Sequence, residues 1–258
     1  MQAIKYPYFN KDRILKIEML ENLRDFPRDV LEIQTEDLSD GIICGLTPIV
    51  DQEIITFSKG IVKYKKELYV ISDPVAISYS ETGTDVIIKL DFNDETSDKD
   101  YRIRNIEITL DRDLDILDNQ IEIGRFKLKS GAYLRSGYQD LYDFTTEYNT
   151  INIVNVLYCG YKQPTLSNLI LKFFAKEALA TRTQDLMDIT FSMMCLNSSR
   201  VERDVIQNYI AYKLTEEINT SATNHELHQK LVKILEDIKQ NNPSKSPKRA
   251  KGRKIIVD

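Results

Sequence analysis

The sequence predicts an α+β protein, in which an N-terminal helix precedes an antiparallel β-sandwich or open barrel, followed by a C-terminal helical module and a basic tail. The apolar period is helical in residues 10–31, becomes two between residues 41 and 129, and is helical again from Pro164 onward. Apolar residues make up 42% and charged residues 29% of the chain, near the averages of globular proteins. With 258 residues the chain can bury a core, and two domains are expected.

These changes of pattern divide the chain into five predicted segments. They are an N-terminal helical arm (1–39), an antiparallel β-domain (40–129), an extended connector (130–163), a helical bundle domain (164–240) and a basic tail (241–258).

The first predicted helix lies in residues 10–31. Asn10 is placed to cap the first turn of a helix whose apolar residues are Ile14, Ile17, Met19, Leu20 and Leu23. Pro27 interrupts the pattern, because proline has no N–H to donate to the preceding turn. We therefore expect one helix that ends near Phe26 and a short helical turn from Pro27 to Leu31.

The β-domain is predicted from short runs rich in Ile, Val, Thr and Tyr. Gly41, Gly45 and Gly60 separate such runs, as turns do between antiparallel strands. In a later run the alternation places four large apolar side chains on one strand face that must be buried: Val86, Ile88, Leu90 and Phe92. Counting runs between turn signals gives about eight short strands.

One of these strands is predicted to contain a β-bulge. The apolar positions change from odd to even across Gly124 and Arg125, since Ile121 and Ile123 come before them and Phe126 and Leu128 after. One extra residue in the strand would return the later side chains to the buried face.

The connector, residues 130–163, contains three glycines and six tyrosines and has little periodicity. Tyrosine combines a large apolar ring with a hydroxyl group, so such a segment can cover a surface without leaving polar groups unpaired. Two interpretations remain open: the connector wraps over a neighbouring surface, or it packs as a loop on the chain's own β-domain.

Four helices are predicted after Pro164, joined by short connections as in a bundle. Their expected bounds are Ser167 to Ala180, Thr183 to Leu196, Arg200 to Asn219 and Asn224 to Gln240. The first has a wide apolar stripe made of Leu169, Ile170, Phe173, Phe174, Ala178 and Leu179. The last has a narrow apolar seam made of Leu227, Leu231, Ile234, Leu235 and Ile238.

Two of these helices begin near matches to the capping box, in which a hydroxyl and a carboxylate satisfy backbone N–H groups of the first turn. The matches are Ser199 with Glu202 and Thr223 with Glu226.

A calcium site is one alternative for the acidic residues 111–122. Asp111, Asp113 and Asp115 alternate, and Glu122 stands at the twelfth position, as in an EF-hand loop. However, Ile116 stands where the sharp turn of that loop requires glycine, and the flanking segments read as strands. A solvated acidic hairpin is therefore expected.

A zinc site is not expected at His225 and His228. These two histidines, with Glu226 between them, are three residues apart, whereas the zinc-protease helix needs a spacing of four. They are the only histidines in the chain, so no third histidine ligand exists. We interpret this segment as the start of a surface helix.

Other catalytic patterns are missing from the sequence. It contains no phosphate-binding Gly-x-x-x-x-Gly-Lys-Ser/Thr loop and no Gly-x-Ser-x-Gly elbow. Cys44, Cys159 and Cys195 are widely spaced and odd in number, which favours a reducing compartment over a disulfide framework. We expect no enzyme, no cofactor and no metal.

The basic tail is the candidate docking segment. Ser244 to Asp258 carries six Lys or Arg and one Asp, whereas the rest of the chain is strongly acidic. We expect the tail to dock on an acidic partner subunit through Lys248, Arg249, Lys251, Arg253, Lys254, Ile255, Ile256 and Val257. A solvated tail and nonspecific contact with nucleic acid are the alternatives, but the tail has no aromatic residue to stack on bases.

Several runs of the sequence resemble baseplate and fibre-attachment proteins of contractile phage tails and of phage-tail-like bacteriocins (tailocins). The resemblance lies within residues 1–161 and covers residues 4–10, 18–29, 40–46, 58–69, 125–129 and 147–153. Its clearest part is the run DGIICGL at residues 40–46, followed by SKGIVKY at 58–64 and by Tyr69. The helical part after Pro164 matches less clearly.

The resemblance implies a noncatalytic structural protein that links baseplate wedge proteins to receptor-binding fibre subunits. The N-terminus lacks a secretory signal, and no segment is apolar enough to cross a membrane, so no membrane partner is expected. We expect assembly in the bacterial cytoplasm and later release of the phage tail or tailocin particle by lysis. The alternative is a regulatory or nucleic-acid-binding protein that uses the basic tail.

Overall fold

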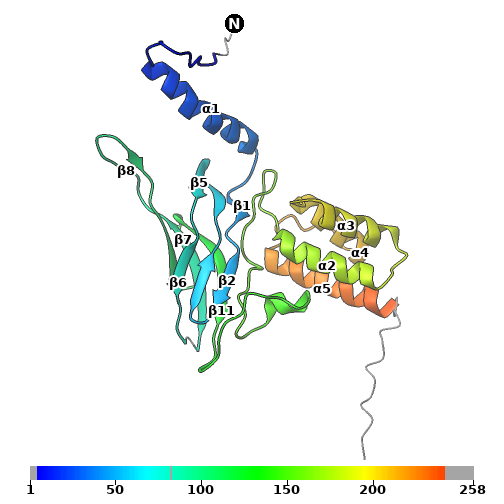
Figure 1. The fold of residues 1–258 in the computed structure, drawn as a ribbon. Helices are drawn as coiled ribbons and strands as arrows, with labels where there is room; N and C mark the ends of the chain where they lie inside the picture. The colour runs from blue at the N-terminus through cyan, green and yellow to red at the C-terminus, as the bar shows by residue number, and fades with distance from the viewer. Residues whose placement is uncertain (1–4, 82, 242–258) are drawn as a thin grey trace, which may run out of the picture.

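The structure is a computed structural model that describes residues 5–81 and 83–241. Figure 1 shows an α+β chain in which the N-terminal helix α1 projects beyond a group of antiparallel sheets, and four further helices lie beside the sheets. The predicted fold class is confirmed. The basic tail lies outside the described residues, and so do all eight residues predicted to dock on a partner.

Helix α1 (Ile17–Thr35) differs from the prediction at both ends and at Pro27. It begins after Lys16, and Asn10 only accepts a turn hydrogen bond from the N–H of Arg13. The helix continues through Pro27 to Thr35 as one element. The loss of one N–H does not end it, because the apolar face continues beyond the proline and the last turn is held by a contact described below.

The β part contains eleven strands among the described residues, more than the eight expected. Nine form three antiparallel sheets with the orders β1-β4-β5, β2-β3-β6 and β10-β7-β11, and β8 pairs with β9 in a hairpin. The bounds are β1 Gly41–Gly45, β2 Pro48–Asp51, β3 Ile54–Phe57, β4 Gly60–Tyr64, β5 Glu67–Ile71, β6 Val75–Ser78, β7 Asp85–Phe92, β8 Thr96–Ser97, β9 Arg102–Ile103, β10 Ile106–Asp111 and β11 Gln120–Lys127.

Strand β7 is the centre of its sheet and is buried on both faces. The predicted face of Val86, Ile88, Leu90 and Phe92 is buried as expected. Ile87 and Lys89 on the opposite face are buried too. The predicted bulge is present in β11, where Glu122 lies opposite Lys89 and Gly124 opposite Ile88, so Ile123 is the extra residue.

Two of the glycines noted in the sequence face each other across a strand pair. Gly45 at the end of β1 lies opposite Gly60 at the start of β4 and has a φ of +74°. A Cβ atom on Gly45 would stand 1.9 Å from the carbonyl oxygen of Lys59, closer than any real contact. The backbones therefore approach so closely that only glycine fits at this position.

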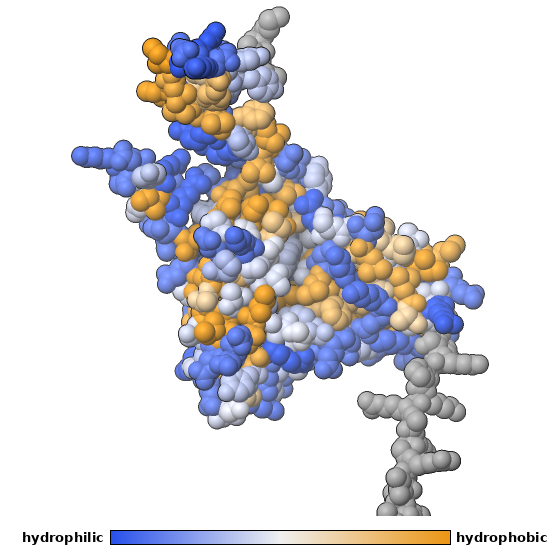
Figure 2. All heavy atoms as spheres, viewed as in Figure 1, coloured by the Kyte–Doolittle hydropathy of each residue, from blue (hydrophilic) through white to orange (hydrophobic). Residues whose placement is uncertain are grey.

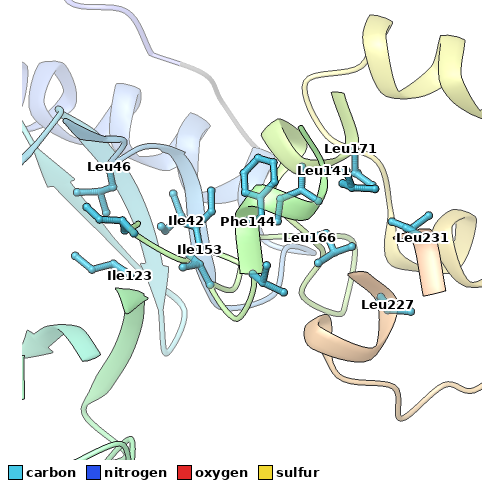
Figure 3. Packing of buried hydrophobic residues seen from close by; sticks show 14 of the residues in the cluster. Ile42, Leu46, Ile123, Leu141, Phe144, Ile153, Leu166, Leu171, Leu227 and Leu231 are labelled. Carbon is cyan, nitrogen blue, oxygen red and sulfur yellow. The ribbon is translucent and has the colours of Figure 1, made fainter. Parts of the chain in front are cut away.

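The connector packs inside the chain itself. Its apolar side chains are buried against both the sheets and the helices, and they include Leu134, Leu141, Phe144, Ile151, Ile153 and Val156. A short 3-10 helix, η1 (Tyr142–Thr145), carries Phe144. Figure 3 shows Ile153 beside the β residues Ile42 and Ile123, and Leu141 and Leu166 on the side of the helices. The connector therefore joins the two parts into one hydrophobic core.

The four predicted C-terminal helices are present, with shifted ends. They are α2 (Asn168–Ala180), α3 (Leu186–Asn197), α4 (Arg203–Leu214) and α5 (Asn224–Asn241). The five apolar residues of the predicted seam on α5 are all buried. On α2, Ile170, Phe174 and Ala178 are buried, whereas Leu169 at the edge of the predicted stripe is exposed.

One predicted capping box is confirmed and the other is wrong. The N–H of Thr223 donates to the Glu226 carboxylate at 2.6 Å, and the N–H of Glu226 donates to Thr223 Oγ1 at 3.2 Å. Ser199 does not cap α4, which begins at Arg203. The carboxylate of Glu202 instead accepts the N–H of Tyr161 in the connector, a tertiary contact that the local motif does not predict.

Candidate interaction surfaces

The acidic residues 111–122 do not form the expected hairpin, because the strands they connect, β10 and β11, pair with β7 on its two sides and not with each other. The carboxylates of this connection have protein partners. Asp111 accepts a hydrogen bond from the buried Lys89 at 2.8 Å, and this bond holds the pKa of Asp111 below its ordinary value. Lys89 also donates to the carbonyl of Asp115. Glu122, the residue that would close a calcium loop, forms a two-point ion pair with Arg125. The oxygens therefore bind cationic side chains and backbone N–H groups.

His228 does not lie on the surface, which corrects the interpretation of residues 225–228. His225 is exposed, but the His228 ring is buried, and its Nε2 lies 3.0 Å from the carbonyl oxygen of Leu141. Burial lowers the pKa of His228 to about 4. The neutral ring donates through Nε2, because the carbonyl can only accept. His228 thus ties α5 to the connector.

In residues 5–81 and 83–241, no group of three His, Cys, Asp or Glu side chains is placed to hold a metal ion. All three cysteines are free, with Cys44 exposed and the other two buried. Burial raises the pKa of Cys159 to about 11 and that of Cys195 to about 12. Both buried thiols are therefore protonated near neutral pH and poorly reactive. Among these residues, no helix is long and apolar enough to span a membrane.

The most conspicuous surface is one face of α1, which we call the arm face. Its large apolar side chains follow one another at helical spacing, and no residue of α1 is buried. The exposed apolar side chains are Ile17, Leu20, Leu23, Phe26, Val30, Leu31 and Ile33, with Ile17 at 75% and Ile33 at 72% exposure. Figure 2 shows apolar surface at this projecting end of the molecule.

The opposite face of α1 is charged. Arg28 lies within 3.4 Å of Glu32 and 3.6 Å of Asp25, and Arg24 donates to Asp25 at 2.7 Å. Exposed pairs of this kind contribute little to stability, because water and salt screen them. They leave the arm face without a charged residue at its centre, so α1 is amphipathic but has its apolar side in water. The ring of Tyr6 contacts Phe26, yet both rings stay largely exposed.

A buried lysine attaches α1 to the sheets. Lys63 in β4 is only 4% exposed, and its Nζ donates to the carbonyls of Thr35, Glu36 and Leu38 at 2.6, 2.9 and 2.7 Å. An ammonium group has three donors, and all three are used here. The positive charge lies where the helix dipole is negative, which stabilises the last turn.

The segment after α1 is also paired with the end of the connector. Ser39 N–H donates to the carbonyl of Gly160 at 2.9 Å, and Lys162 N–H donates to that of Asp37 at 2.8 Å. We call this pairing of residues 37–42 with 157–162 the junction. It places the chain entering the sheets beside the chain leaving for the helices.

A second surface is an apolar groove between α3 and α4. It has a volume of about 480 Å³ and is lined by Met187, Thr190, Phe191, Met194, Asp204, Val205, Asn208, Tyr209 and Tyr212. The rings of Phe191 and Tyr209 are buried and stack with their centroids 4.0 Å apart, which makes the floor. Met187, Met194 and Tyr212 are exposed at the walls. We call this surface the α3–α4 groove.

Acidic residues outnumber basic ones in the stretch of chain that forms the α3–α4 groove, and Asp204 lines the groove itself. Between Asp185 and Glu217 there are six Asp or Glu and three Lys or Arg. Asp185 pairs with Lys213 at 2.8 Å, and this hydrogen bond lowers the pKa of Asp185. Glu217 and Asp204 make no ion pair within the described part of the chain. The groove is thus lined by one acidic residue, Asp204, and by no basic one.

Sequence patterns could identify α1 as amphipathic but not that its apolar side is uncovered. Likewise, the sequence predicts α3 and α4 as helices but does not predict the groove between them, because a groove depends on how two helices pack. Apolar residues near acidic ones would have been the available signal, as in Tyr212 with Glu216 and Glu217.

Comparisons with known proteins found likenesses among solved structures. No protein-family model matches the sequence, and no curated protein matches it. The fold is similar to the crystal structure of TssK, with a TM-score of 0.36 and 10% identity over 92% of this chain and 69% of that one. It is also similar to a chain of the type VI secretion system TssK-TssF-TssG baseplate subcomplex, determined by cryo-electron microscopy, with a TM-score of 0.41 and 10% identity over 92% of this chain and 100% of that one. At these scores neither likeness carries a conclusion about function.

Proposed function

We propose that this chain is a noncatalytic structural component of a contractile tail or tailocin baseplate, and that it links wedge proteins to receptor-binding fibre subunits. The uncovered arm face of α1 is the observation that carries the proposal. The resemblance of residues 40–46 and 58–69 to baseplate proteins supports this class of assembly. The chain is made in the bacterial cytoplasm and leaves it within a particle released by lysis.

The arm face has the properties of a contact surface between subunits. Seven large apolar side chains are exposed along one helix, and soluble monomers rarely expose such a continuous patch. An amphipathic helix is commonly bound by laying its apolar face in a groove of another protein. Because α1 projects from the sheets, as Figure 1 shows, it can enter such a groove without a clash from the rest of the chain.

The sheets and the helical module give the arm a firm base. Lys63 and the junction fix the end of α1, and the single hydrophobic core joins the sheets to the helices. A subunit bound at α1 is therefore connected through packed structure to one bound at the helical module. This arrangement suits a linking protein.

The proposal can be tested in a host that makes the particles. The gene is replaced by a variant with Leu23→Glu and Phe26→Glu, which places two charges on the arm face while leaving the buried core unchanged. A matched control changes Glu18 and Glu21 to Gln on the charged face. Particles are purified and their subunits quantified by mass spectrometry.

We expect the wild-type chain and the control variant in the particles, and the Leu23→Glu/Phe26→Glu variant only as free folded protein. The proposal is wrong if the wild-type chain is never found in particles. The role of α1 is wrong if the arm-face variant enters particles as well as the control does.

A further inference from the structure

We infer that the α3–α4 groove is the binding site for the C-terminal segment 244–258 of the same chain. In this arrangement Ile255, Ile256 and Val257 fill the apolar groove, and the lysines and arginines of residues 248–254 lie near Asp204 and Glu217. This inference does not depend on the proposed baseplate function.

The chemistry of the groove matches that of the segment. The groove floor is aromatic and its walls include two methionines, whose flexible thioethers adapt to different apolar side chains. The only apolar cluster in residues 244–258 is the run of two isoleucines and a valine near its end. Three β-branched side chains are of the size that such a groove accepts.

The charges match as well. The segment carries six Lys or Arg and one Asp, whereas the α3–α4 region has twice as many acidic as basic residues. Glu217 and Asp204, which have no ion pair in the described structure, lie near opposite ends of α4. A basic stretch laid along the helix can therefore meet a carboxylate at each end. Such contacts steer binding and weaken with added salt.

The described chain ends at the end of the helical module from which the segment can reach the groove. Lys239 in the last turn of α5 pairs with Glu177 near the end of α2 at 2.7 Å. A short turn then leads from α2 to Asp185 at the start of α3, where Lys213 of α4 also reaches. The groove therefore opens at the end of the module where α5 finishes.

The segment is also long enough. Ile255 lies fourteen positions after Asn241, and an extended chain covers at most about 46–50 Å over that length. The groove runs along α4, whose 12 residues span only about 18 Å. A short tether gives an effective concentration of about 1 mM, so even a segment with a Kd of about 0.1 mM would fill the groove about nine tenths of the time.

Methionine oxidation can test this inference, because α3 carries its own control. Met187 and Met194 line the groove and are exposed, whereas Met193 is exposed but does not line it. The oxidation rate of each methionine by dilute peroxide is measured by mass spectrometry in the full chain and in a chain that ends at Pro243. Circular dichroism checks that both are folded.

We expect Met187 and Met194 to oxidise on the order of tenfold faster in the truncated chain, given the occupancy above. Met193 should react equally in both. A full-length variant with Ile255, Ile256 and Val257 changed to Ser should behave as the truncated chain, and a synthetic peptide of residues 244–258 should restore protection to the truncated chain.

Three results would overturn the inference. Equal rates at Met187 and Met194 in the full and truncated chains would show that the groove is open, as expected if the segment binds only another subunit. Protection that also covers Met193 would indicate a general change in α3. Protection that appears only at high protein concentration, together with a dimer in light scattering, would show that the segment binds a second copy instead.

Discussion

Replacing Lys63 by Met should loosen α1 from the sheets. Methionine keeps most of the unbranched side chain but removes the ammonium group, so the buried methylene packing remains while three hydrogen bonds are lost. The carbonyls of Thr35, Glu36 and Leu38 are then left without their donor.

The size of the effect follows from the exposure of these carbonyls. A buried polar group without a partner costs about 1–3 kcal/mol. Glu36 is exposed, and Thr35 and Leu38 are partly exposed, so water can reach the freed carbonyls and the low end of that range applies. We therefore expect Lys63→Met to reduce the free energy of unfolding by about 3 kcal/mol, about 1 kcal/mol for each carbonyl.

Urea unfolding measures this loss, and hydrogen exchange locates it. With a slope of about 3 kcal/mol/M, the midpoint should move by about 1 M. Amide exchange should speed up most in the last turn of α1. The control is Lys66→Met, three residues along the chain, where the side chain is exposed. If Lys63→Met stays within about 0.5 kcal/mol of that control, the lysine does not anchor the helix and the reasoning fails.

Two further predictions concern the helical module. Burial lowers the pKa of His228 from 6.5 to about 4, so the unfolded chain binds more protons between these values and stability falls as the pH drops from 6.5 to 4, by about 3 kcal/mol. In His228→Leu the hydrogen bond to Leu141 is lost, but this fall in stability between pH 6.5 and 4 should disappear as well. An unchanged pH profile in urea titrations of the variant would contradict the assignment. Thr223→Ala should lower the midpoint of thermal unfolding by removing about 1 kcal/mol of capping, whereas Ser199→Ala, which removes a similar hydroxyl that caps no helix, should not; equal effects would contradict the capping assignment.

Much of the fold could be predicted where the determinants are local. The alternation in residues 86–92 requires a strand with a buried face, and the parity change near Gly124 requires an extra residue. Thr223 and Glu226, which supply the hydroxyl and the carboxylate, are close in sequence, so their capping box can be predicted from the sequence alone.

The predictions that failed depend on contacts between distant residues. Nothing near Thr35 indicates that Lys63 will hold the end of α1, so the first helix was expected to end near Phe26, with only a short helical turn from Pro27 to Leu31. His228 resembles a surface residue until the connector carbonyl of Leu141 is placed against it. Glu202 has the spacing of a capping residue, but its carboxylate accepts a hydrogen bond from the backbone N–H of Tyr161 instead.

The candidate surfaces were only partly predictable for the same reason. Periodicity identifies the apolar side of α1, but whether that side is covered depends on the rest of the fold. The basic tail is evident in the sequence, whereas the α3–α4 groove appears only after two helices are packed.

The junction has a mechanical consequence. Residue 37 follows α1 and lies beside residue 162, which leads to α2, so the two chain ends leave the pairing on the same side. Tension applied between α1 and the C-terminal helices therefore breaks the hydrogen bonds of the pairing one after another. The bond from Lys162 to Asp37 breaks first, and the bond from Ser39 to Gly160 follows. Bonds loaded one at a time resist less force than bonds loaded together. Because Lys63 also holds the carbonyls at the end of α1, strand β4 shares this tension with the junction from the start.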